Sequence, residues 1–530
     1  MFLATSLLPQ AATPPDWAVL QSQGAIISAI KVDPQDVFNL SDPQENTWLG
    51  REGNRLHWTT REPVIRAALL FKVGDRVSVR RIRETERLLR AMAFLKTAHI
   101  DPEVLPDGSV AAHVWVQDAW TLKISGGYQQ VGGQKSSGFG LQEQNLLGTG
   151  KTVAFSYAHN PIQTSGTFEY SDPELLGSTW ALDTQYQRLS DGSARILNLQ
   201  RPFLSLDTPW SATIQTASTG SSLVMYDRTV GIYSATSQLN NWTLGAAWAA
   251  FHNDSYALRP GVTLVEHEAR YGTLTTLADP EGLPAPNLAP RRLRGPALSF
   301  SFLVDGFQVF RDMLGMDYPE DYNLGWAGSV LAGRYLPSWG STEPALFAQT
   351  QWSKAWSGSD RDLLLVQASA SGRKGSGAWE DTLADLTATG YWKASPYQIT
   401  AVHLVLDTSR RPDPEDVYYL GATQGLNGYP NDLHPGDARW LVSLSQRMLT
   451  DQRWLGLVRA GYAVFTDLGA IHRMDGSGWS TPYADVGGGL RMGNLRSSAG
   501  HVILITVAFP LVREPGQNRW QLLFGNTVQF

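Results

Sequence analysis

The segment of this sequence that most resembles a ligand-binding motif is NLLGTGKT, residues 145–152. A phosphate-binding loop needs a glycine where Asn145 stands, and a helix must follow the loop. Residues 152–159 instead alternate apolar and polar side chains, which is typical of a strand. We therefore interpret Gly148, Thr149 and Gly150 as a tight turn between strands, and we do not expect nucleotide binding.

Other chemistry-bearing residues are scattered along the chain. The ten histidines show no metal-ligand spacing, and we interpret Glu266, His267 and Glu268 as a polar loop rather than a metal site. No GxSxG nucleophile motif occurs. Glu415 and Asp416 lie in a proline-rich stretch, where solvated carboxylates are expected. The sequence therefore predicts no enzyme, no metal site and no cofactor.

Composition narrows the class of protein. The chain has 530 residues and no cysteine, which excludes a disulfide scaffold and a cysteine nucleophile. Its net charge is −6 with no basic tail, so a nucleic-acid partner is not expected. No apolar run approaches the roughly 20 residues of a membrane-spanning helix. Strands of a membrane barrel alternate in polarity and escape that test, so local patterns must decide.

Residues 25–119 predict a small α+β domain. Residues 25–32 form an extended run, residues 61–71 have one apolar helical face, and Ser78 can cap a second amphipathic helix. Two extended runs follow at residues 99–104 and 110–116, so the order of elements is βααββ. The preceding residues 1–24 contain a short apolar stretch before Ala11 and Ala12, and we interpret them as a signal-peptide remnant or a disordered lead.

Residues 120–530 read as a long series of alternating strands. Residues 152–159, 345–356 and 501–509 each place apolar side chains on one face, and aromatic residues recur near segment ends. A soluble sandwich also alternates, but about 410 residues are long for one sandwich domain. A closed barrel leaves no unpaired backbone in lipid, so we expect a transmembrane antiparallel β-barrel. Residues 273–296 and 407–437 interrupt the pattern and are expected to be long extracellular loops.

Several strings then add up to a family. In chain order they are GFGLQEQNLLGTGKTVAFSY at residues 138–157, EYSDPELLGSTWAL at 169–182, YLGATQGLNGYPNDLHPGDARWLVSLSQR at 419–447, FTDLG at 465–469, DVGGGLR at 485–491 and VAFPL at 507–511. Together with the terminal Phe530, this ordered set resembles the barrel of the BamA/TamA-type outer-membrane assembly proteins, the bacterial surface antigen superfamily. The resemblance covers roughly residues 121–530.

The resemblance implies an outer-membrane barrel of about sixteen strands. Because the segment count slightly exceeds this number, some segments are expected to be loop hairpins. The βααββ order of residues 25–119 is that of the family's periplasmic POTRA domain, and the chain has room for one clear copy. Relatives of the assembly type usually carry several copies.

The resemblance also implies a loop that folds back into the lumen, with a tip formed by Gly425, Leu426, Asn427, Gly428, Tyr429 and Pro430. Family members usually have arginine where this chain has Asn427, and glutamate where it has Gln446. The acidic partner Asp467 is retained. Losing the arginine and the glutamate together avoids an unpaired buried charge. We expect Asp467 to pair with Arg447, Arg491 or Asn427, and Asn427 and Gln446 to act as a coupled neutral pair.

Two functions of different classes follow from these features. The first is insertion, assembly or translocation of proteins through a lateral seam between residues 121–131 and residues 519–530. The second is a structural barrel or passive pore, and a role in lipid delivery or surface export is not separable from these by sequence. The seam is expected to be the weakest strand pair. Its residues and the C-terminal signal are Trp520, Phe524, Gly525, Asn526 and Phe530.

The partners implied are outer-membrane lipid, unfolded or β-strand client polypeptides that bind the POTRA-like domain, and periplasmic or inner-membrane partner proteins. The barrel is expected to be monomeric, in the bacterial outer membrane, with its N-terminal domain in the periplasm.

Overall fold

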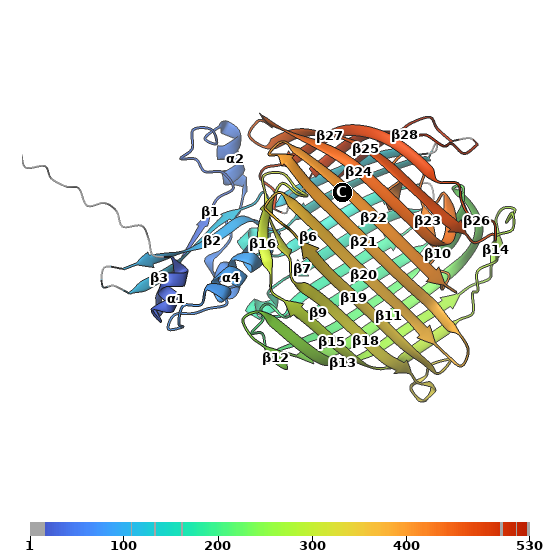
Figure 1. Cartoon of the computed structure of the whole chain (residues 1–530), viewed down its shortest axis with the longest axis horizontal. Helices are drawn as coiled ribbons and strands as arrows, with labels where there is room; N and C mark the ends of the chain where they lie inside the picture. The colour runs from blue at the N-terminus through green and yellow to red at the C-terminus, as the bar shows by residue number, and fades with distance from the viewer. Residues whose placement is uncertain are drawn as a thin grey trace, which may run out of the picture.

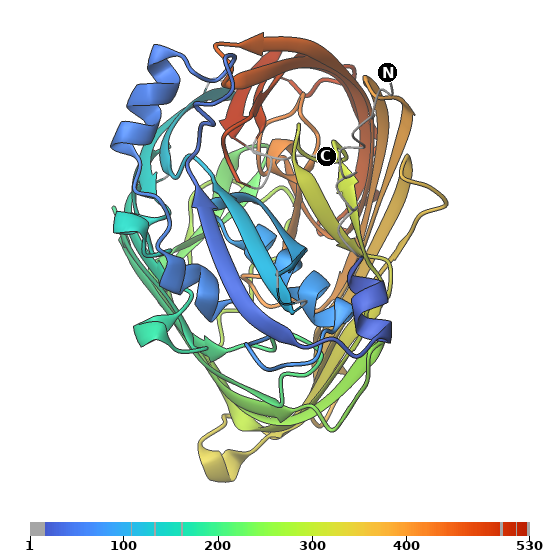
Figure 2. The same ribbon diagram turned by 90° about the vertical axis from the view of Figure 1, so that its left-hand side faces the viewer.

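The chain folds into two parts in the computed structural model, which describes residues 16–105, 107, 109–131, 134–160, 163–498, 502–515 and 517–526. A small N-terminal domain lies at one end of a large β-barrel (Figure 1). Viewed from that end, the domain lies across the mouth of the barrel (Figure 2). We call this end of the barrel the domain end and the opposite one the far end.

The N-terminal domain is a three-stranded sheet with helices packed against it. The central strand pairs in parallel with the first strand and antiparallel with the second, in the order β1-β3-β2. Its elements are α1 (Trp17–Ser22), β1 (Ile27–Gln35), α2 (Trp48–Leu56), α3 (Glu62–Ala67), α4 (Val79–Ala91), β2 (Leu95–Val104) and β3 (Val110–Asp118).

The expected strand, helix, helix, strand, strand order is present, with two additional helices. The Ser78 hydroxyl accepts a hydrogen bond from the Arg81 amide and caps α4, as the sequence predicted. Interpreting residues 1–24 as a remnant or a disordered lead was wrong for α1, because Trp17 and Leu20 are buried in the core of the domain. The short α2 was missed because it buries only glycines among its residues. Residues 1–15 lie outside the described part.

The barrel begins at Leu122, close to the predicted boundary. Its long strands are β4 (Leu122–Val131), β5 (Gln134–Glu143), β6 (Thr152–His159), β7 (Thr164–Asp172), β8 (Ala181–Leu189), β9 (Gly192–Arg201), β10 (Trp210–Asp227), β11 (Val230–Trp248), β13 (Tyr256–Tyr271), β15 (Arg291–Val304), β18 (Trp326–Tyr335), β19 (Ala345–Trp356), β20 (Asp362–Lys374), β21 (Trp379–Ser395), β22 (Gln398–Arg410), β24 (His434–Trp454), β25 (Val458–Arg473), β27 (Tyr483–Asn494), β28 (Val502–Pro510) and β29 (Gln521–Asn526). Short strands join this wall: β12 (Phe251–His252), β14 (Thr275–Thr276), β23 (Tyr418–Leu420) and β26 (Gly478–Trp479).

The expected number of sixteen strands was wrong. Among the described residues the wall contains about twenty long antiparallel strands, closed between β29 and β4. The number sixteen came from the family resemblance. In the structure, more segments than this have a lipid-facing side and pair with a strand on each side, so they all join the wall. One surplus segment does leave the wall as a separate hairpin, formed by β16 (Phe307–Arg311) and β17 (Pro319–Asn323).

Exposed apolar side chains cover the outer face of the barrel. At the domain end, tryptophans mark the strand ends and are 43 to 71% exposed. Amphipathic rings at this level are what a membrane interface favours. These tryptophans are Trp210, Trp248, Trp326, Trp356, Trp392 and Trp454. Within the described residues, no helix has the length and apolar character needed to span a membrane.

Two connections fold into the lumen from opposite ends. The connection between β22 and β24, residues 411–433, enters from the far end, where the other long connection, residues 272–290, also lies. The β16–β17 hairpin connects β15 to β18 at the domain end, where Figure 1 places it beside α4. Both connections predicted as long loops therefore lie at the same end, opposite the N-terminal domain.

Candidate functional site

The tip of the far-end loop, Gly425 to Pro430, is buried inside the barrel. Leu426 and Tyr429 are fully shielded from solvent and pack with Leu433, Leu441 and Ile471. Apolar burial on this scale anchors a loop that has no strand partners of its own at its tip. The expected position of the loop inside the lumen is therefore the observed one.

The polar side of the loop tip rests on two neighbouring carboxylates. Asp467 on β25 and Asp485 on β27 are register partners, and both are buried. The Asn427 side-chain amide donates to Asp467 at 2.9 Å, and the Gly428 backbone amide donates to Asp485 at 2.9 Å. Asn427 is thus the partner of Asp467, one of the three that the sequence offered. Amide donors hold the position where a guanidinium was expected from the family.

Close packing at Gly428 and polar and ring contacts at Tyr429 fix the next two residues of the tip. A Cβ atom added at Gly428 would lie 2.6 Å from Cβ of Asp485, so only glycine fits without displacement. The Tyr429 hydroxyl lies within hydrogen-bond distance of the carbonyls of Ala484 and Val512, at 2.8 and 2.7 Å, and its ring packs edge-on against Tyr483. The loop tip is therefore held by β27 and by the connection that precedes the last strand.

The two arginines predicted as partners of Asp467 lie elsewhere. Arg447 donates to the carbonyl of Met313, and Arg491 donates to the carbonyl of Leu314, at 2.9 and 3.3 Å. Both carbonyls belong to the domain-end hairpin, which sequence reasoning did not place in the lumen. The prediction that Arg447 or Arg491 compensates Asp467 was wrong because these side chains face the lumen at a different depth.

Gln446 was also assigned wrongly. It accepts a hydrogen bond from Thr400 on β22 at 2.7 Å, on the face of β24 opposite the one that carries Arg447. Successive strand residues point to opposite sides of a sheet, so adjacent residues cannot both face the lumen. Ser443, the register partner of Asp467, stands where Gln446 was expected. The proposed coupling of Asn427 with Gln446 has no contact to support it.

The loop tip also touches the last strand of the barrel. The carbonyl of Gly428 accepts hydrogen bonds from the side-chain amides of Gln517 and Gln521, at 3.2 and 3.0 Å. Gln521 opens β29 and is fully buried, facing the lumen. Trp520 and Phe524 are exposed on the outer side, as the alternation predicted. Sequence reasoning did not single out either glutamine, although the same alternation places Gln521 on the inner face.

The seam between β29 and β4 is sparsely paired. Among the described residues these strands share one register pair, Leu522 with Gln130. By comparison, β28 and β29 share six pairs, and β4 and β5 share ten. Gly525 faces the lumen and pairs with Leu504. Asn526 pairs with Ile503, but its side chain, like Phe530, lies outside the described part.

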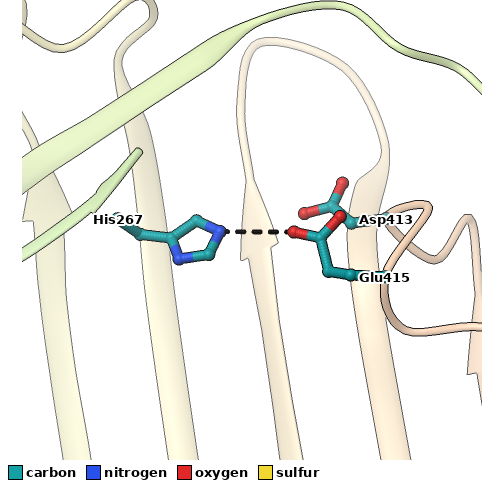
Figure 3. A group of neighbouring side chains, drawn as sticks. All are labelled: His267, Asp413 and Glu415. Carbon is teal, nitrogen blue, oxygen red and sulfur yellow. Dashed lines mark ion pairs between the residues drawn. The ribbon is translucent and has the colours of Figure 1, made fainter. Parts of the chain in front are cut away.

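A charged cluster fixes the outer part of the far-end loop (Figure 3). His267 Nε2 lies 3.6 Å from a carboxylate oxygen of Glu415, with Asp413 beside it. His267 lies on β13 rather than in a loop, and Glu415 is half-buried rather than solvated, so both expectations were wrong. Guanidinium groups already occupy these carboxylates, since Arg373 and Arg291 reach Asp413 at 2.6 and 2.9 Å. The cluster is therefore an ion-pair network in this structure.

The segment that resembled a phosphate loop lies at the junction of the domain and the barrel. Its Asn145 side chain accepts from the Gly150 amide at 2.7 Å and donates to Thr60 of the domain at 2.9 Å. The Gly148 carbonyl accepts from the Arg61 amide at 2.9 Å. Gly148 and Gly150 both have positive φ, and β6 follows instead of a helix. The segment is the expected tight turn, and it also links the two parts of the chain.

Comparison with solved structures finds two CdiB proteins and a BamA among the matches. CdiB from Escherichia coli has 12% identity and a TM-score of 0.47, with 94% of this chain and 76% of that chain covered. CdiB from Acinetobacter baumannii has 11% identity and a TM-score of 0.41, with 95% and 73% covered. A crystal structure of BamA from Haemophilus ducreyi lacking POTRA domains 1-3 has 12% identity and a TM-score of 0.36, with 94% and 84% covered.

The BamA and CdiB structures are thus what this chain is similar to, at TM-scores below 0.5. No known family profile matches the sequence, and no curated protein matches it. At these identities the likeness concerns the fold alone, so function has to be argued from the residues of this chain.

Proposed function

We propose that the chain is an outer-membrane barrel that inserts or translocates polypeptides by opening laterally between β29 and β4. The observation that carries this proposal is the seam, where a single register pair joins the described parts of two strands that border lipid. Unpaired backbone groups in lipid cost several kcal/mol each, on the order of the loss of a strong hydrogen bond. A strand from a client could recover that energy by pairing with an opened edge.

The lumenal loop supports the same proposal. Its tip binds β27 and the first residue of β29, so a movement of the loop is transmitted directly to one edge of the seam. The N-terminal domain would act as a POTRA domain in the periplasm, where the free edges of β1 and β2 offer sites for client strands or partner proteins. On this proposal the barrel works as a monomer surrounded by outer-membrane lipid.

A passive pore or structural barrel is the second candidate. The observation that favours it is the neutral loop tip, because Asn427 binds Asp467 without the charge that family members place there. A barrel with no need to open would also tolerate a seam locked shut. The two candidates therefore differ in one measurable property, the need for the seam to separate.

The test uses the absence of cysteine from the chain. In the Gln130→Cys/Leu522→Cys variant, oxidation would join the register partners of the seam. The matched control, Ile505→Cys/Phe524→Cys, joins register partners of the neighbouring pair β28 and β29. Each variant would replace the native chain in its host, and the abundance of other barrels in the outer membrane would be measured.

We expect oxidation of the seam variant to lower the abundance of other barrels, reductant to restore it, and oxidation of the control to have no effect. Normal outer-membrane composition with a fully oxidised seam would reject lateral opening. If depletion of the chain itself also left that composition unchanged, the passive pore would be the better account.

A further inference from the structure

The β16–β17 hairpin is a second lumenal insert with its own anchors, and neither the seam nor the far-end loop involves it. It forms a separate two-stranded sheet between β15 and β18. At its tip, Met313 and Met316 are almost completely buried and belong to one apolar cluster with Leu363, Tyr391 and Ile399 from the barrel wall. A turn between two strands of a barrel is normally short and solvated on this side.

Charged side chains of the wall hold the tip from inside. Arg447 and Arg491 donate to the carbonyls of Met313 and Leu314. Arg459 contacts the carboxylate of Asp317 at 2.7 Å. All three arginines are more than nine-tenths buried.

The tip is also organised within itself. The buried carboxylate of Glu320 accepts from the backbone amides of Leu314 and Gly315 and from the Tyr322 hydroxyl, at 3.1, 2.9 and 2.7 Å. These bonds fix the turn whether or not the wall surrounds it. The hairpin can therefore move as a unit rather than unfold.

The part of the barrel wall that surrounds the tip, its seat, contains buried arginine nitrogens without hydrogen-bond partners among the described residues. Two nitrogens of Arg447, Nε and one terminal nitrogen, and Nε of Arg491 have no hydrogen-bond partner among the described residues. Leaving a buried charged donor unpaired costs more than a typical hydrogen bond gains, and water entering a vacated seat would satisfy all three donors. The unpaired donors therefore lower the free-energy cost of withdrawing the hairpin from its seat.

Support from outside the seat comes from α4 of the N-terminal domain. The Arg90 guanidinium binds both oxygens of Asp321, at 2.7 and 2.8 Å, and the Tyr318 hydroxyl donates to the Arg90 carbonyl at 3.0 Å. Arg87 lies 3.5 Å from Asp305, at the start of the hairpin, and its guanidinium sits 3.7 Å from the centre of the Phe307 ring. Two arginines one helical turn apart therefore hold the start and the return strand of the hairpin.

We infer that the hairpin of residues 305–325 is a plug at the domain end of the lumen, kept in its seat by the docking of α4. When α4 moves away from the barrel, the plug loses its outer anchors and withdraws, and Arg447, Arg491 and Arg459 become accessible as a cationic surface inside the lumen. Movement of the N-terminal domain thereby controls access to the lumen. This inference does not depend on whether the seam opens.

The experiment measures how often the plug leaves its seat. In the Met316→Cys full-length protein, reconstituted in liposomes, the rate of labelling by a charged maleimide reports exposure of the buried tip. Adding Asp305→Asn and Asp321→Asn removes the contacts with Arg87 and Arg90. We expect labelling to become roughly tenfold faster or more, because the open population rises when the outer anchors are lost.

Two controls separate plug release from general loosening. Glu103→Gln breaks an exposed ion pair between Lys31 of β1 and Glu103 of β2, which takes no part in the docking of α4, and it should leave the labelling rate nearly unchanged. Met225→Cys places a thiol at a buried site in another cluster, and its labelling should not respond to Asp305→Asn/Asp321→Asn. The inference is wrong if the Met316→Cys thiol labels rapidly without the aspartate substitutions, if those substitutions do not accelerate it, or if either control accelerates equally.

Discussion

At the residue scale, the lumenal site is defined by an amide facing two carboxylates. Asn427 donates to Asp467 and Gly428 donates to Asp485, and all of these hydrogen bonds come from neutral amides. Hydrogen bonds to a carboxylate are stronger than bonds between neutral groups, but an arginine would add charge and a second donor. The neutral tip thus gives a loop that is anchored by shape and by weaker polar contacts.

We expect Asn427→Arg to strengthen loop docking and Asn427→Ala to weaken it by about 1–3 kcal/mol, the usual value of a hydrogen bond to a charged group. The measurement is the rate of proteolysis within residues 411–433 of the folded barrel, with Thr423→Ala as the control at an exposed position of the same loop. Because Gln446 faces the outer side of β24, adding Gln446→Glu to Asn427→Arg should bring no further gain. A cooperative gain in the double variant would contradict the geometry described here.

At the element scale, the far-end loop is held by charge as well as by apolar packing. Burial raises the pKa of Asp416, helped by the nearby charges of Asp381, Glu415 and Asp413, to about 7. Burial also acts on Glu415, but the nearby His267, a hydrogen bond from Tyr271 and the charge of Arg291 outweigh it and lower the pKa of Glu415 to about 2. Neighbouring carboxylates of one loop thus titrate in different pH ranges.

The sign of the resulting pH dependence follows from Asp416. An undocked aspartate has a pKa near 3.8, so between about pH 4 and pH 7 the docked loop binds more protons than the released loop. The contribution of Asp416 to docking is therefore largest below its ordinary pKa of 3.8, and it is lost as the pH rises through its docked pKa of about 7. Above about pH 5.5 Glu415 is ionised in both states, so it does not oppose the effect of Asp416 between pH 5.5 and pH 7.

We accordingly expect residues 411–416 to be cut a few-fold more slowly at pH 5.5 than at pH 8, after correction for protease activity. Asp416→Asn should keep the slow rate at both values, because its side chain is neutral throughout. If the variant and the parent show the same pH dependence, another group controls docking of this loop.

At the scale of the whole molecule, α4 joins the two parts through arginines that meet acidic turns of the barrel. Arg80 contacts Asp207 and Asp254 in two different turns, at 2.8 Å each, and also Glu84 on its own helix. Glu84 is buried, which raises its pKa, while the Leu206 amide and the charges of Arg80 and Arg87 counter the rise. One guanidinium thus connects three carboxylates at the interface.

We expect Arg80→Ala to loosen the interface by about 1–3 kcal/mol, because it leaves the buried Glu84 carboxylate without its nearest charge. Arg80→Lys should recover only part of this, since an ammonium cannot bind several carboxylates in a planar fork. Hydrogen exchange of α4 and of residues 202–209 is the measurement. Arg55→Ala, which removes an exposed ion pair on α2, is the control and should leave both segments unchanged.

The sequence by itself determined the class of fold and most of the strand positions. Apolar alternation with a period of two depends only on local order, so β6 and β19 have the bounds that the pattern predicted. The cap at Ser78 and the turn at Gly148 to Gly150 are equally local, because short-range backbone geometry fixes them. The same period places Gln446 and Arg447 on opposite faces of their strand, so the sequence already excludes a lumenal position for one of the two.

Only the tertiary structure decided the number of strands, the partners of the buried charges and the role of the domain-end hairpin. Strand number depends on how the barrel closes, and no local pattern encodes closure. The partners of Arg447 and Asp467 come from loops that are distant in the chain. Which loop each side chain meets depends on how far along the barrel axis that side chain lies. The β16–β17 hairpin reads as another alternating segment, and it became a plug because α4, more than 200 residues away, holds it by Arg90 and Asp321.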